Sequence, residues 1–264
     1  MSHEHAVYLS KIKRKERFVV SMRYVILIGF LLLWELFARI GVIDPFIASS
    51  PSRVVRTILS LYNEGSLFTH IGTTLYETVV GFLLGTLMGI LLASILWWFP
   101  TANKIFDPYL VVLNALPKIA LGPILIVWIG ATEASIIAMG VLISLIVTIM
   151  TVLNGFNEIS DSKQKLMLTL GASKWQIFVK IVLPASIPTM MSALKLSVGM
   201  TWVGIIVGEY LVSKAGLGYL IVYGGQVFQL DLVMASIILL CILAALMYYI
   251  VAYFEKRIIK WRKH

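Results

Sequence analysis

Long apolar stretches separated by short polar connections dominate the chain from residue 24 onward. Six of them are long enough to cross a bilayer as helices: residues 24–43, 71–98, 106–129, 132–153, 187–212 and 231–254. The third contains Pro117 and Pro123, so we expect that helix to be broken or kinked. The pattern predicts an all-α membrane protein with about six transmembrane helices.

Composition excludes a soluble globular protein. Hydrophobic residues make up 59% of the 264 residues and charged residues 13%, against roughly 45–50% and 25% in globular domains. The mean hydropathy is +0.93. Cys241 is the single cysteine, so no disulfide can form within the chain. The first apolar stretch is followed by Asp44-Pro45 and not by a cleavage motif, so we expect it to remain as a span.

The distribution of basic residues predicts the orientation. With six spans and both termini on one side, 16 of the 22 Lys and Arg fall on that side, and Arg53, Arg56 and Lys214 fall on the other. The side richer in Lys and Arg is normally cytoplasmic. We therefore expect a basic cytoplasmic tail at residues 1–23, a transmembrane domain at 24–254 and a second basic cytoplasmic tail at 255–264.

Two further patterns concern packing. Residues 51–62 predict a short amphipathic helix on the outer side, with Val54, Val55, Ile58, Leu59 and Tyr62 on one face. Glycines recur every fourth residue in the second span, at Gly81, Gly85 and Gly89, and such a stripe lets a neighbouring helix approach closely.

The 158–184 connection is too polar to span and predicts a helical hairpin. Asp161, with Gln164 three residues later, indicates a helix start, and Gly171 stands where that helix would stop. Ser173 and Gln176 indicate a second start, and Pro184 the end of the second helix. We call this segment the cytoplasmic hairpin; an amphipathic loop resting on the bilayer is the alternative.

The hairpin carries a recognisable motif. The chain has Gly171, then nine residues, then Ile181, one further residue and Leu183-Pro184. This spacing matches the signature loop of permease subunits of binding-protein-dependent ABC importers. Five segments resemble the nitrate/sulfonate/taurine branch of this family: Ser50-Pro-Ser-Arg-Val54, Leu116-Pro-Lys-Ile-Ala-Leu-Gly-Pro123, Leu170-Gly-Ala-Ser-Lys-Trp-Gln176, Lys180-Ile-Val-Leu-Pro-Ala185 and Gly216-Leu-Gly-Tyr-Leu220. Together the resemblance covers about residues 45–255.

This resemblance implies the type I (MetI-like) permease fold, in the cell membrane of a bacterium, with both termini cytoplasmic. It implies two ATPase subunits docked on the hairpins, a second permease copy (a homodimer) and an extracytoplasmic binding protein that delivers a small solute. ATP and Mg²⁺ would then be bound by the partner ATPases, and no cofactor by this chain. The implied ATPase-coupling residues are Lys165, Leu166, Leu170, Gly171, Ala172, Ser173 and Trp175. At position 165 the family signature has Glu, and this chain has Lys.

Charged and special residues in or near the spans are candidates for the pathway or its outer gate: Pro117, Lys118, Lys195, Glu209, Gly216, Gly218 and Tyr219. Several of them could instead have purely structural roles: Lys118 could bind a backbone carbonyl, and Gly216–Tyr219 could form a simple tight turn. Glu35 and Arg39 are expected to pair, and Glu77 to reach headgroups or water.

Two other functional classes compete with the importer permease. A membrane-embedded transferase acting on a lipid pyrophosphate needs clustered carboxylates to hold Mg²⁺, but the four aspartates are scattered singly. A self-sufficient secondary transporter usually has an internal repeat, and none is found. The chain itself lacks a Walker A motif, since no lysine follows a glycine. The solute is expected to be a small anion (sulfonate, taurine, nitrate or bicarbonate) or a vitamin precursor.

Overall fold

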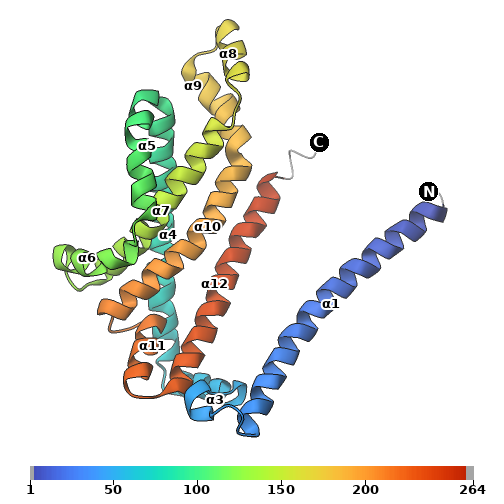
Figure 1. Ribbon diagram of the computed structural model, residues 1–264, viewed down its shortest axis with the longest axis vertical. Coiled ribbons are helices and arrows are strands. Elements are labelled where there is room, and N and C mark those ends of the chain that lie inside the picture. Colours follow the sequence, from blue (N-terminus) through green and yellow to red (C-terminus); the bar gives the residue numbers. More distant parts are fainter. Residues whose placement is uncertain (1–2, 260–264) are drawn as a thin grey trace.

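The computed structural model describes residues 3–259, and every regular element in that range is helical (Figure 1). The long helices are α1 (His3–Arg39), α4 (Leu67–Trp98), α7 (Glu133–Asn157), α10 (Leu183–Val212) and α12 (Leu230–Ile259). The shorter elements are α2 (Pro45–Ala48), α3 (Pro51–Asn63), α5 (Pro100–Ala115), η1 (Lys118–Leu121), α6 (Gly122–Ile129), α8 (Asp161–Thr169), α9 (Lys174–Ile177), η2 (Phe178–Val182) and α11 (Leu217–Gln226).

The polar connections gather at two opposite ends of the molecule. In Figure 1, α8 and α9 project beyond the long helices at one end, and α3 and α11 lie at the other. The start of α1 and the end of α12 point towards the α8–α9 end. Among the described residues, five helices are long and apolar enough to cross a membrane, and the predicted six are reached if the bent pair formed by residues 100–115 and 118–129 counts as one span.

Close helix packing holds α4, α7 and α10 together. The glycine stripe of α4 lies on α7, as the sequence predicts: a Cβ added to Gly89 would lie 2.6 Å from the Thr148 side chain. The contact of α7 with α10 is closer still, because a Cβ on Gly204 would lie 2.6 Å from the Cα of Gly140. Small residues thus bring the backbones into direct contact, as is common in membrane bundles.

The third predicted span is broken. Residues 100–115 and 118–129 form two helical pieces that meet at 90°, so the predicted break is confirmed, while the first piece begins at Pro100 and not at residue 106. Pro117 lies in the two-residue gap and cannot donate the backbone hydrogen bond that would continue α5. The second piece, α6, extends sideways from the bundle (Figure 1), and Val127 and Trp128 on it are 82% and 77% exposed.

The first span stands apart from the other long helices. Its most apolar window has no buried residue, and in Figure 1 it diverges from α12 towards its N-terminal end. At its C-terminal end, Glu35 accepts hydrogen bonds from Arg39 and from the backbone N–H of Ser52, which starts α3. The predicted Glu35–Arg39 pair is therefore confirmed, and the same carboxylate also joins α1 to α3.

The helix of the adjoining span continues into each predicted basic tail. Helix α1 already begins at His3, so the polar residues before Tyr24 continue the first span as a helix. Helix α12 likewise runs through Ile259, and the last residues of the predicted tail, 260–264, lie outside the described range. In both places the chain stays helical after its apolar stretch ends, because Lys, Arg and Glu are good helix formers.

The short helix predicted over residues 51–62 is confirmed as α3, but its apolar face divides in two. Val54 is buried, and Ile58 is partly buried against the adjoining hydrophobic cluster. Val55, Leu59 and Tyr62, which the sequence places on the same face, are each more than half exposed. One side of α3 therefore packs on the bundle, and an adjacent apolar side stays uncovered.

Candidate functional site: the hairpin and the outer turn

The cytoplasmic hairpin forms, and Gly171 ends its first helix. Gly171 has a φ of +83°, a conformation that glycine adopts without a side-chain clash. Its N–H donates to the carbonyl of Leu168, and the N–H of Ala172 donates to that of Met167. These two bonds make up a Schellman motif, which satisfies carbonyls that the end of α8 would leave unpaired.

The second helix starts with the predicted capping box. The Ser173 hydroxyl accepts from the N–H of Gln176, and the Gln176 side chain accepts from the N–H of Ser173. The start predicted at Asp161 differs: the N-cap position is Ser160, and the Gln164 side chain donates to the carbonyl of Ile159. That side chain thereby bonds backwards to the chain that leaves α7.

The second helix does not stop at Pro184, and this prediction is wrong. Residues 174–212 form one continuous helical run with a π-helical segment at Phe178–Val182. The N–H of Leu183 donates to the carbonyl of Phe178, one residue further back than in an α-helix. A wider turn of this kind accommodates a proline that cannot donate. The hairpin and α10 are therefore joined by one uninterrupted helical run.

Aromatic residues fix the hairpin to the end of α4. Phe178 contacts Trp97, Phe156 and Trp175, with ring centroids 5.0–6.2 Å apart. The Lys174 ammonium donates to the carbonyl of Trp98 and lies 5.1 Å from the centroid of that ring. These aromatic and cation–π contacts stabilise the packing of several rings against one another. They anchor the base of the hairpin to both α4 and α7.

The tip of the hairpin exposes apolar side chains. Leu166, Leu170 and Trp175 are 60%, 72% and 63% exposed, and Lys165 is also exposed beside them. Gly171 and Ser173 are exposed at the turn itself, whereas Ala172 is half-buried against the aromatic cluster. Large apolar residues gathered on a polar, protruding segment indicate a surface that contacts another protein or the membrane.

The two lysines proposed for the pathway each have a partner. Lys118 donates to the carbonyl of Asn114, 3.0 Å away, and so caps the end of α5 where Pro117 interrupts the helix. Lys195 of α10 forms an ion pair with Glu255 of α12, at 2.8 Å. The side chains of this pair are 23% and 22% exposed. Both contacts fit a structural role for these lysines.

Breaking the Lys195–Glu255 pair is expected to destabilise the packing of α10 against α12. Lys195→Met leaves the Glu255 carboxylate without its partner in a mostly buried position, which costs more than the ~0.2–1 kcal/mol of an exposed pair. We expect a lower melting temperature in detergent for Lys195→Met and recovery in the exchanged pair Lys195→Glu/Glu255→Lys. Equal melting temperatures for the wild type and Lys195→Met would contradict this account.

At the other end, a buried carboxylate organises the connection between α10 and α11. We call residues 213–218 the outer turn. Glu209 is 1% exposed and accepts from the Thr74 hydroxyl, at 2.6 Å, and from the N–H of Gly218. The Thr74 oxygen in turn accepts from the N–H of Leu217, at 2.8 Å. Glu209 therefore binds the first residues of α11 to α4, and it is not a solvated residue at a helix end.

The glycines and Tyr219 of the outer turn have defined places. Gly216 has a φ of +111°, and its N–H donates to Nδ1 of His70 at 3.1 Å. A Cβ on Gly218 would lie 2.6 Å from Oε2 of Glu209, so only glycine leaves room for the carboxylate. Tyr219 stacks between His70 and Tyr223. The turn is thus more than the simple tight turn that the sequence also allowed.

Glu77 is placed differently from its prediction. It is 0% exposed, so it reaches neither headgroups nor water. It lies three residues after Thr74 on α4, on the same helix face as this residue that binds Glu209. The position along the span indicated the depth of Glu77 but not the direction of its side chain.

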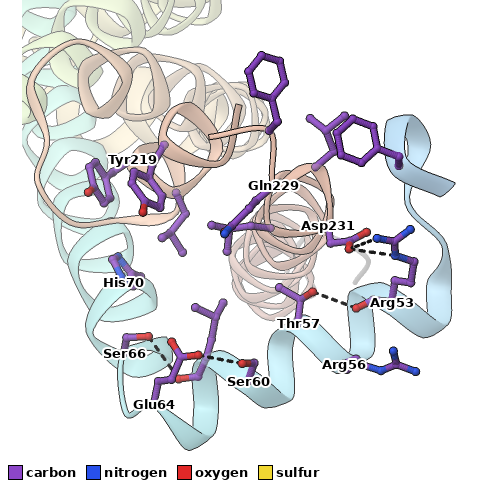
Figure 2. A pocket seen from close by; sticks show the side chains of 17 residues that line it. Arg53, Arg56, Thr57, Ser60, Glu64, Ser66, His70, Tyr219, Gln229 and Asp231 are labelled. Atoms are coloured by element: carbon purple, nitrogen blue, oxygen red, sulfur yellow. Dashed lines mark hydrogen bonds and ion pairs between the residues drawn. The ribbon is translucent and has the colours of Figure 1, made fainter. Parts of the chain in front are cut away.

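An open cavity of about 760 Å³ lies beside the outer turn, between α3 and the starts of α4, α11 and α12 (Figure 2). Arg53 crosses its edge and pairs with Asp231, at 2.8 Å. The charges along the wall balance, since Arg53 and Arg56 face Glu64 and Asp231. Sequence reasoning missed this cavity, because its lining residues come from two stretches far apart in the chain, 46–70 and 219–232.

Known proteins resemble the chain over most of its length. Residues 85–260 match the family described as binding-protein-dependent transport system inner membrane component. A Bacillus subtilis protein named as an aliphatic sulfonates transport permease, SsuC, is 31% identical over 87% of this chain and 83% of its own. ThiX of Halalkalibacterium halodurans, a formylaminopyrimidine transport permease, is 30% identical over 88% of this chain and 92% of its own. Escherichia coli TauC, a taurine transport system permease, is 24% identical over 94% and 93%.

Solved structures show the same fold at low sequence identity. A bacterial ABC transporter of the acidic polysaccharide alginate matches with a TM-score of 0.65 at 17% identity, over 96% of this chain and 100% of its own. The MetNI methionine ABC transporter, in an inward-facing conformation, matches with a TM-score of 0.61 at 19% identity, over 72% of this chain and 94% of its own. The protein is thus a multi-pass membrane permease of the MetI-like fold and belongs to the binding-protein-dependent transport system inner membrane component family.

Proposed function

We propose that this chain forms half of the translocation pathway of an ATP-driven ABC importer for a small solute. The observation that carries the proposal is the hairpin of α8 and α9, which projects beyond the bundle and exposes Leu166, Leu170 and Trp175. Family membership supports it, since members are inner membrane components of binding-protein-dependent transport systems.

The ATPase subunit docks on the hairpin tip. Its groove receives the turn at Gly171 and covers the exposed leucines, while Lys165 contacts an acidic or neutral part of that groove. ATP and Mg²⁺ are bound by the ATPase, whose movement enters the membrane along the continuous helix of residues 174–212. Rigid-body displacement of packed helices then opens one face and closes the other. The hairpin and both termini lie on the cytoplasmic side, as the basic residues predict.

A second copy of the chain completes the pathway. Helix α1 is the element most in need of a partner, because it leaves the bundle and its apolar window has no buried residue. The divergence of α1 leaves room for a transmembrane helix of the second copy beside it. Two-fold pairing is the commonest arrangement of identical subunits.

An external binding protein delivers the solute at the end where α3 and α11 lie. The names of the relatives favour two solute classes, a small organosulfonate (SsuC and TauC) and an aminopyrimidine vitamin precursor (ThiX). The balanced charges around the outer cavity give no strong preference for an anion there. We therefore assign most of the choice of solute to the binding protein.

Transport assays in proteoliposomes test this function. The full chain is reconstituted with its ATPase and binding protein, and uptake of radiolabelled taurine, ethanesulfonate and formylaminopyrimidine is measured. We expect uptake of one of these classes only when ATP is present on the hairpin side and the binding protein on the other. Uptake by the permease alone, driven by an ion gradient, would instead establish a secondary transporter.

A further inference from the structure

Two carboxyl groups lie buried together beneath the outer turn. Glu77 is 0% and Glu209 is 1% exposed. Glu77 lies on α4 three residues after Thr74, whose hydroxyl donates to Glu209 at 2.6 Å, so both carboxyl groups belong to one buried region. Two negative charges held close together and away from water repel strongly. The pair therefore requires either a proton or a cation to be stable.

The hydrogen bonds distinguish the two groups. Both oxygens of Glu209 accept a hydrogen bond, one from Thr74 and the other from Gly218. Neither oxygen of Glu77 has a donor among the residues that the structure describes. Glu209 therefore has the hydrogen bonds of an ionised acceptor. Glu77 lacks such bonds and is suited to be the protonated donor.

The surroundings favour a proton over a cation. Across residues 3–259, the ion pairs formed by Lys and Arg do not include Glu77 or Glu209, and no third His, Cys, Asp or Glu in that range joins them in a group that could hold a metal ion. Lys214 and Glu133 line a neighbouring cavity of about 490 Å³ that Glu77 also borders, but Lys214 makes no ion pair with Glu77. A carboxyl that donates to a carboxylate satisfies both groups.

We propose that Glu77 and Glu209 share one proton, and that this pair fastens the outer turn to α4. Glu77 would then be a positioning residue: it holds the Glu209 carboxylate where it binds Gly218, and Thr74, on the same face of α4, holds Leu217. The role of the pair in transport rests on the proposed function: the pair keeps the outer end closed until the binding protein docks. Loss of the Glu77 donor should release the start of α11.

The shared proton is tested by infrared spectroscopy on the purified full chain in nanodiscs. The spectrum of the wild type minus that of Glu77→Gln should show the carbonyl band of a protonated carboxylic acid at neutral pH. The matched control is Glu133→Gln, an exposed acid at the same cavity, whose difference spectrum should lack this band. Absence of the band from the Glu77→Gln difference spectrum would overturn the proposal, and this result does not depend on transport.

The role of the pair is tested on the assembled transporter. Glu77→Gln keeps a neutral N–H donor and should keep basal ATP hydrolysis and uptake near wild type. Glu77→Leu keeps the volume but removes the donor, and should raise ATP hydrolysis in the absence of binding protein several-fold while lowering its stimulation. If Glu77→Gln is as impaired as Glu77→Leu, the negative charge is needed and the shared proton is wrong. A wild-type complex without ATP-dependent uptake would instead refute the proposed function.

Discussion

Replacing Gly171 by leucine is expected to abolish uptake while the protein still inserts in the membrane at near-normal abundance. The φ of +83° at Gly171 disfavours a side chain by about 1–2 kcal/mol, whatever space is available. An added Cβ would meet nothing within 4 Å, so no packing inside the chain is disturbed. The harm arises at the hairpin tip, where a distorted turn and a bulky side chain no longer fit the ATPase.

Gly65 offers a matched control at the opposite end of the molecule. It has a φ of +74°, has open space around its Cβ position, and ends α3 with the same pair of hydrogen bonds as Gly171. Gly65→Leu therefore introduces the same backbone strain far from the ATPase. We expect it to retain uptake and ATPase stimulation, which Gly171→Leu loses. Normal uptake and normal ATPase stimulation in Gly171→Leu would show that the hairpin turn is a tolerant surface loop.

Local features of the fold could be predicted from the sequence because their causes are local. The length of an apolar run sets whether a helix can cross the membrane, and this placed α4, α7, α10 and α12. The capping box at Ser173 and Gln176 depends only on residues three apart, and it formed as predicted. The same holds for Gly171, which the end of a helix requires in a left-handed conformation.

Features that depend on distant contacts could not be predicted. Lys195 is paired with a residue 60 positions away, Thr74 with one 135 away, and Arg53 with one 178 away. A hydropathy pattern indicates how deep such a residue lies along its helix, but not which neighbour it faces. For this reason the sequence left Lys195 open as a pathway residue and placed Glu77 near water.

The third span combines a local feature that the sequence predicts with a feature that depends on distant contacts. Pro117 and Pro123 predicted that the helix is interrupted, because proline removes a backbone donor wherever it stands. The 90° angle between the two pieces depends instead on where α6 packs. One such contact is Gly122, where an added Cβ would lie 2.6 Å from the Leu211 side chain and 2.8 Å from that of Met139.

The contact between α7 and α10 should be the position least tolerant of a larger residue. At Gly204, a Cβ would lie 2.6 Å from the Cα of Gly140 and 2.7 Å from the carbonyl oxygen of Met139. Both are backbone atoms, so no side chain can rotate away and the two helices must separate. Gly204→Leu is therefore expected not to accumulate in the membrane. Gly204→Ala should accumulate with its free energy of unfolding lowered by about 1–3 kcal/mol.

Gly199, on the same helix, separates this packing effect from the preference of helices for alanine. It is exposed, and a Cβ there would meet nothing within 4 Å. Gly199→Ala should therefore gain up to about 1 kcal/mol from helix propensity and raise the melting temperature, whereas Gly204→Ala should lower it. The measurement is thermal unfolding of the purified full chain in detergent. Shifts of the same sign would contradict the close α7–α10 contact, because propensity alone acts equally at both glycines.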